Sequence, residues 1–182
     1  LEAFAYNYED GQIKKTALNL SNSFTEKIND YWKVEKFAVP NVKPGTVIEY
    51  KYKINSQYLF NLRDWEFQWR IPVVYSEYEA NMIPFYDYTY ILQQANKFDA
   101  QQSYVNKMKP PRRLSTVEYL DMVHKYIMTD IPAFKDEEYI TSVNDHIIKL
   151  DFQLSKISYP RPRDCGSPSR ASIILASYIF FE

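Results

Sequence analysis

The sequence predicts an all-β protein, an antiparallel β-sandwich with at most one short helix. The first observation is the aromatic content, since the 182 residues include 17 Tyr and 11 Phe. Aromatic rings suit the pleated, half-buried surface of a sheet, and few Ala-rich or Leu-rich runs at helical spacing compete with them. The second observation is that alternating segments are separated by turn signals such as Asp10-Gly11 and Pro44-Gly45. Both patterns favour strands joined by tight turns.

The first third of the chain carries the clearest strand signals. Asp10-Gly11 is a strong hairpin signal, and the strand before it would begin upstream of Leu1. At the second turn Pro44 fixes φ and Gly45 accepts positive φ, so the segments on either side are candidates for a further hairpin. The four strands expected in this region are residues 4–8, 12–20, 31–39 and 46–54.

The middle of the chain continues the β pattern. After a loop at residues 61–64, strands are expected at residues 65–71, 73–83 and 86–93. Pro72 separates the first two of these strands. Because proline cannot donate a ladder hydrogen bond, it marks an edge, a bulge or a break there.

Local signals disagree between residues 103 and 131. Ser115-Thr116-Val117-Glu118 resembles a helix capping box, whereas residues 122–131 alternate as a strand does. We therefore expect a helix or turn at residues 115–121, followed by a strand. A final long strand is expected at residues 145–158, with one face formed by Ile148, Leu150, Phe152 and Leu154.

The stretch from Phe37 to Gln68 also carries a family resemblance. Asn41-Val42-Lys43-Pro44-Gly45-Thr46-Val47-Ile48-Glu49-Tyr50 leads into Phe60-Asn61-Leu62-Arg63-Asp64-Trp65-Glu66-Phe67-Gln68. Both segments resemble the N-terminal domain of unknown function that precedes the transglutaminase-like core in many bacterial envelope proteins. Shorter matches are Tyr6-Asn7, Asp10-Gly11, Ser76-Glu77-Tyr78, residues 131–137 and residues 150–154, so the resemblance spans most of residues 1–158.

The resemblance implies an accessory domain without established chemistry of its own. In full-length relatives the partner would be the neighbouring transglutaminase-like domain, and the location would be the periplasm or cell envelope. The resemblance divides the chain into a β-sandwich accessory domain at residues 1–159, with an incomplete N-terminus, and an atypical tail at residues 160–182. One hypothesis for the tail is a frameshifted or truncated coding sequence without the catalytic core. The alternative is a divergent tail that adds one more strand.

Composition excludes some classes of function. The 22 basic residues are matched by 23 acidic ones, and this balance argues against a nucleic-acid binder. The longest apolar run, residues 173–181, is shorter than the roughly 20 residues of a membrane-spanning helix. No signal peptide is visible in the chain. The single Cys excludes an intramolecular disulfide.

The sequence offers little for catalysis or metal binding. A Cys nucleophile needs a positioned base, yet both His124 and His146 precede Cys165, whereas the transglutaminase-like order is Cys, His, Asp. The spacing of the two His residues predicts no zinc site. We therefore expect no catalytic residue, no metal and no cofactor, with a cysteine-dependent hydrolase or acyltransferase as a remote alternative.

The strongest candidates for binding are aromatic. Trp65, Phe67 and Trp69 share one face of the expected strand by period two, and Tyr58 and Phe60 lie just before it. We expect this face to be core, because large aromatic side chains usually fill the interior of a sandwich. If the face is exposed instead, Tyr58, Trp65, Phe67 and Trp69 would form a platform for a glycan or a protein partner.

The sequence therefore predicts a non-catalytic accessory or interaction domain. It would pack against or present a neighbouring domain, or bind a partner in the envelope. The alternative from a different class is a carbohydrate-binding module that uses the exposed aromatic rings.

Overall fold

The computed structural model describes residues 1–29, 33–56, 62–114, 116–135, 142–158 and 171–181. Within these residues the regular structure consists of β-strands and two single 3₁₀ turns, Leu20–Asn22 and Val143–Asp145. The predicted all-β class is confirmed, and no described strands close into a barrel.

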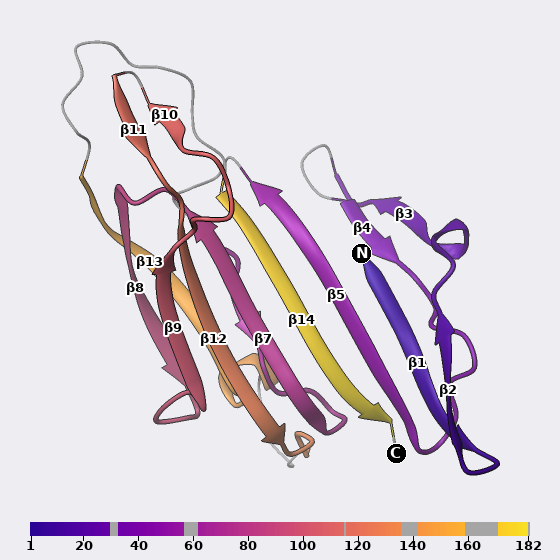
Figure 1. The fold of residues 1–182 in the computed structure, drawn as a ribbon. Helices are drawn as coiled ribbons and strands as arrows, with labels where there is room; N and C mark the ends of the chain where they lie inside the picture. The colour runs from indigo at the N-terminus through magenta and orange to yellow at the C-terminus, as the bar shows by residue number, and fades with distance from the viewer. Residues whose placement is uncertain (30–32, 57–61, 115, 136–141, 159–170, 182) are drawn as a thin grey trace.

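The larger sheet has seven antiparallel strands in the order β2-β1-β5-β14-β7-β12-β9. In Figure 1 these strands lie side by side, with β14 between β5 and β7. The strands are β1 (Glu2–Glu9), β2 (Gln12–Ala17), β5 (Thr46–Ser56), β7 (Val73–Met82), β9 (Ala100–Val105), β12 (Met122–Ile131) and β14 (Ala171–Phe181).

A smaller sheet has three antiparallel strands in the order β6-β13-β8. Two short antiparallel ribbons, β3 with β4 and β10 with β11, complete the described strands. Their bounds are β3 (Phe24–Lys27), β4 (Lys33–Lys36), β6 (Trp65–Glu66), β8 (Tyr86–Gln93), β10 (Arg112–Leu114), β11 (Val117–Tyr119) and β13 (Lys149–Ile157).

The two sheets enclose an aromatic core. Tyr78 of β7 stacks on Phe152 of β13, with ring centroids 5.1 Å apart, and Tyr126 of β12 contacts the same ring at 5.8 Å. Tyr78 is fully buried, and Tyr126 is nearly so. Because each strand places alternate side chains on opposite faces, one face of the larger sheet supplies this core and the other points away from the smaller sheet.

Local turn chemistry produces the first hairpin as predicted. Asp10 and Gly11 both adopt positive φ, 52° and 78°, the backbone that a two-residue hairpin turn requires. β1 and β2 pair on either side, from Glu9 with Gln12 to Phe4 with Ala17. Gly45 also has a positive φ of 86°, and β5 begins at the next residue, Thr46.

The second predicted hairpin is wrong. β4 pairs with β3, whereas β5 pairs with β1 and β14. β4 is short and mostly exposed, so it has little apolar surface to place in the sheet. The inner side chains of β5 instead pack against the core, for example Tyr52, whose ring centroid lies 6.2 Å from that of Trp65. Long-range packing therefore overrides the local hairpin signal.

Three other expectations differ from the structure. At residues 115–121, where we expected a helix or a turn, the helix is wrong: Thr116 lies in a turn, and Leu114 pairs with Val117 and Arg112 with Tyr119 in the β10–β11 ribbon. The aromatic ring of Tyr119 packs edge-on against Phe85 at 5.3 Å, a contact that favours the strand. The strand expected at residues 65–71 has only two residues, and β9 was not expected.

The tail contributes to the larger sheet. Residues 171–181 form β14, which pairs over its length with β5 and along most of its length with β7. This is the added strand that the sequence left open as an alternative. Without β14 the larger sheet would divide into a three-stranded part and a second three-stranded part.

Candidate functional site

The structure separates the predicted aromatic residues. Trp65 and Phe67 are buried, with 4% and 0% of their surface exposed, whereas Trp69 is 41% exposed. Tyr58 and Phe60 lie outside the described residues. β6 ends at Glu66, so the period of two that would place Trp69 on the same face does not continue.

The buried pair belongs to the core, as we expected. The indole of Trp65 lies 6.4 Å from the ring of Tyr78, and Phe67 lies 6.0 Å from Phe98. Neither ring offers a free face to a sugar. Trp69 is the one member of the predicted set that the structure describes as exposed, and its Nε1 donates a hydrogen bond to the Glu66 carbonyl at 3.2 Å. A glycan-stacking role among the described candidates therefore depends on Trp69 alone.

The candidates for catalysis are dispersed. Nδ1 of His124 lies 2.9 Å from Oγ of Ser103, and burial lowers the pKa of this imidazole. His146 is an exposed residue that follows the Val143–Asp145 turn, and Cys165 lies outside the described residues. In the described part of the chain, no three His, Cys, Asp or Glu side chains gather as metal ligands would. Among the described residues, no third group is seen to orient His124 as the base of a triad would be oriented.

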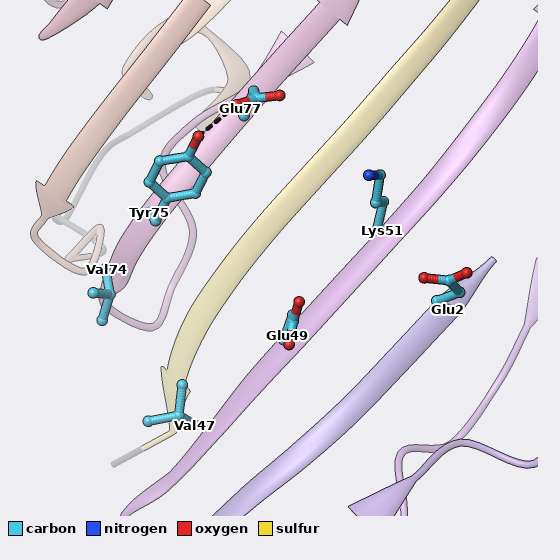
Figure 2. A pocket seen from close by; sticks show the side chains of 7 residues that line it. All are labelled: Glu2, Val47, Glu49, Lys51, Val74, Tyr75 and Glu77. Carbon is cyan, nitrogen blue, oxygen red and sulfur yellow. Dashed lines mark hydrogen bonds between the residues drawn. The ribbon is translucent and has the colours of Figure 1, made fainter. Parts of the chain in front are cut away.

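A groove lies instead on the outer face of the larger sheet, the face that points away from the smaller sheet. It is an open hollow of about 660 Å³. Figure 2 shows it from close by, with β14 running between the residues of β5 and β7. The described residues that line it come from three strands: Glu2 of β1, Val47, Glu49 and Lys51 of β5, and Val74, Tyr75 and Glu77 of β7.

Hydrogen bonds hold two of the groove's carboxylates in place. The hydroxyl of Tyr6 donates to Glu49 at 2.5 Å, and the hydroxyl of Tyr75 donates to Glu77 at 2.5 Å. Lys125 of β12 also donates to Glu77, at 3.1 Å. Hydroxyl donors to ionised oxygens form short, strong hydrogen bonds, so these side chains are ordered before any partner arrives.

Lysines border the groove on both sides. Nζ of Lys125 lies 2.8 Å from Glu79 and 3.1 Å from Glu77. Partial burial acts to lower the pKa of Lys125, but the hydrogen bonds that its ammonium group donates to Glu79 and Glu77 outweigh burial and raise the pKa. On the other side, Nζ of Lys15 lies 3.6 Å from the centre of the Phe4 ring, within cation–π range.

The groove itself is acidic. Its described lining carries three carboxylates, Glu2, Glu49 and Glu77, and one lysine, Lys51. The sequence of β14 contains no charged residue, so this strand adds no charge to the three carboxylates and one lysine. Sequence reasoning missed the groove, because its residues lie on three strands whose register only the folded sheet reveals.

Comparison with protein-family models, with curated proteins and with solved structures finds no match to this chain. The described residues include no helix with the length and apolarity to cross a membrane.

Proposed function

We propose that this chain is a non-catalytic interaction domain that binds a neighbouring domain or an envelope partner through the outer face of its larger sheet. The observation that carries the proposal is the acidic groove between β5 and β7, with its ordered carboxylates. A groove on an open sheet face suits a protein surface better than a small reactant, which enzymes enclose in a deep pocket.

Order in the groove favours binding. Fixing flexible side chains at an interface weakens association, typically by about 0.5–1.5 kcal/mol for each side chain. The hydrogen bonds from Tyr6 to Glu49 and from Tyr75 to Glu77 meet part of this cost before binding. The groove therefore presents a preorganised, acidic surface.

The chemistry of the groove also indicates the partner. Glu77 is already paired with Lys125, whereas Glu2 and Glu49 stand on the β1 and β5 side with Lys51 as the cation in the lining. A Lys or Arg side chain of the partner would complete the pairing of these carboxylates. Arginine fits best, because its planar group binds a carboxylate through two hydrogen bonds.

The family resemblance supports the same role. Domains similar to residues 1–158 precede a transglutaminase-like core in bacterial envelope proteins, so the partner that we propose is such a neighbouring domain or another envelope protein. This assignment depends on the shared segments around Asn41-Val42-Lys43 and Trp65-Glu66-Phe67.

Site-specific photo-crosslinking in the producing cell tests the proposal. The photoreactive amino acid p-benzoylphenylalanine replaces Val74, which lines the groove and is 46% exposed. We expect a discrete crosslinked adduct from this position. The matched position is Phe24 on β3, which is 61% exposed and belongs to the β3–β4 ribbon outside the larger sheet. No adduct from position 74, or equal adducts from both positions, would overturn the proposal.

Charge reversal tests whether the acidic groove is responsible for the crosslinked adduct. Glu49→Lys should abolish the adduct formed from position 74, because it removes a carboxylate and repels a basic partner. Glu118→Lys makes the same charge change on the exposed β11 strand and should leave the adduct intact. Alkylation of Cys165 should also leave it intact if the function needs no thiol. Circular dichroism of each purified variant confirms that the sheet content is unchanged.

A further inference from the structure

Both sheets end on the same side of the sandwich. β9 is the terminal strand of the larger sheet, and β8 is a terminal strand of the smaller sheet. The hydroxyl of Tyr90 on β8 donates a hydrogen bond to Gln101 Oε1 on β9 at 3.1 Å. Figure 1 shows the two strands side by side at one end of the molecule. This end, which we call the β8/β9 edge, therefore presents two open strands together.

The backbone of β9 has one satisfied side and one open side. The amide of Asn106 donates to the Asp121 carbonyl at 2.7 Å, which fixes the alternation of hydrogen-bonded pairs along β9 and β12. Ala100, Gln102 and Tyr104 then direct their amide and carbonyl groups toward β12. The corresponding groups of Gln101, Ser103 and Val105 point outward, where no strand in the described part of the chain pairs with them.

β9 lacks the features that usually protect an edge. Edge strands are commonly guarded by lysine, proline or a bulge. The sequence of β9, Ala-Gln-Gln-Ser-Tyr-Val, contains no charged residue and no proline, and its register with β12 is unbroken. The opposite edge, β2, carries Lys14 and Lys15. The two edges of the same sheet therefore differ in how open they are to another strand.

Exposed apolar surface accompanies the open backbone. Tyr104 and Val105 of β9 are 44% and 41% exposed, and Tyr90 of β8 is 38% exposed. A strand added to β9 would cover part of this surface in addition to pairing its amide groups. Backbone pairing supplies affinity in such strand additions, and side-chain contacts supply specificity.

We propose that two copies of this chain associate through antiparallel pairing of β9 with β9. The occupant is a second copy because the strand is neutral and can meet itself without placing like charges opposite one another. The outward groups at Gln101, Ser103 and Val105 are symmetric about Ser103. A two-fold axis there places Ser103 opposite Ser103 of the second copy, and Gln101 opposite Val105 of the second copy. The larger sheet then continues across both copies.

The competing edge cannot pair with itself as easily. Antiparallel pairing of β2 with a second β2 would gather Lys14 and Lys15 of both copies in one short ribbon. Like charges directly opposite in a sheet are destabilising. Charge therefore selects β9 over β2 for self-association. This inference does not depend on the proposed function, because the groove lies at β1, β5 and β7 rather than at the β8/β9 edge.

Sedimentation velocity of the full chain tests the proposal. We expect the apparent mass of the wild type to rise with concentration to twice the 21.7 kDa of a single chain. Ser103→Pro removes one outward N–H and the side-chain contact of Ser103 with His124, but leaves the backbone bonds to β12, and should yield a monomer. Ile13→Pro makes the same change on the outer side of β2, where Ile13 is 72% exposed, and should leave the dimer intact.

Complementary charges at the axis distinguish a second copy from any other occupant. Ser103→Lys and Ser103→Asp place like charges opposite one another and should each be monomeric, and a one-to-one mixture should recover the dimer. Circular dichroism verifies that each variant is folded. A wild type that stays monomeric would overturn the proposal. A dimer that persists in Ser103→Lys, or a mixture that fails to associate, would overturn it as well.

Discussion

The indole Nε1 of Trp65 donates a hydrogen bond of 2.9 Å to Oγ of Ser76, with both side chains buried. Trp65 belongs to β6 of the smaller sheet and Ser76 to β7 of the larger sheet. The bond therefore crosses the interface between the two layers. It also explains how a tryptophan can lie in the core, because a buried indole N–H needs an acceptor.

The first prediction concerns this bond. Ser76→Ala leaves the indole N–H of Trp65 buried without its acceptor, so the free energy of unfolding should fall by about 1–3 kcal/mol. Urea denaturation should show a lower midpoint with an unchanged slope. Ser158→Ala, at an exposed serine, should leave the midpoint unchanged. A Ser76→Ala variant as stable as the wild type would show that the bond across the layers contributes nothing to stability.

The second prediction concerns Tyr78, the largest of the fully buried side chains in the described part of the chain. Its hydroxyl has no hydrogen-bond partner in the described part of the chain, and desolvation raises its pKa. Burying an unpaired hydroxyl costs about 1–3 kcal/mol. Tyr78→Phe removes this cost and keeps the ring stacked on Phe152, so the free energy of unfolding should rise by about 1 kcal/mol.

A matched tyrosine should respond in the opposite direction. The hydroxyl of Tyr6 donates to Glu49 at 2.5 Å, so Tyr6→Phe removes a hydrogen bond to a charged group. The free energy of unfolding should then fall by about 1.5–3 kcal/mol. Thermal or urea denaturation of both variants measures the two effects side by side. If Tyr78→Phe also lowers stability, the hydroxyl of Tyr78 has an acceptor in the folded protein.

The third prediction concerns pH and His124. Burial lowers the pKa of His124 below its usual 6.5, so the unfolded chain binds a proton at this site before the folded chain does. The stability that comes from keeping His124 neutral is complete above pH 6.5 and is lost as the pH falls toward the pKa of the folded state. His124→Gln should flatten the decline of the urea midpoint between about pH 7 and pH 5. His146→Gln makes the same substitution at the exposed histidine and is the matched control.

Local chemistry explains which parts of the fold were predictable. The Asp10-Gly11 turn needs only its own backbone to adopt positive φ, so the first hairpin follows from the sequence. The alternation of residues 122–131 likewise reflects one buried face, and β12 forms as expected. The burial of Trp65 and Phe67 follows from their size.

Long-range pairing explains which parts were not predictable. Residues 115–118 carry a capping-box pattern, yet Leu114 pairs with Val117, and the contact of Tyr119 with Phe85 favours this strand pair. The acidic groove brings together Glu2, Glu49 and Glu77 across three strands, and their alignment depends on the register of β14 between β5 and β7. No local pattern in the sequence records that register.

The last prediction concerns Glu9, at the end of β1. Nζ of Lys14 lies 2.8 Å from its carboxylate, and Lys43 from the loop before β5 pairs with it on the other side. Hydrogen bonds from Lys14 and then Lys43 lower the pKa of Glu9 from 4.5 to about 2. The pairing of the Glu9 carboxylate with the two lysines therefore stabilises the fold fully above pH 4.5, and this stabilisation is lost as the pH falls through about 2.

Glu9→Gln removes the titrating group while keeping the shape of the side chain. The urea midpoint of this variant should vary less than that of the wild type between pH 4.5 and about 2. Salt should reduce the difference between the two proteins, because the pair is accessible to screening ions. Glu118→Gln makes the same substitution at an exposed position on β11 and is the matched control. If Glu9→Gln keeps the wild-type dependence of the urea midpoint on pH, the two lysines do not stabilise the folded carboxylate. Other contacts would then hold the first hairpin to the loop before β5.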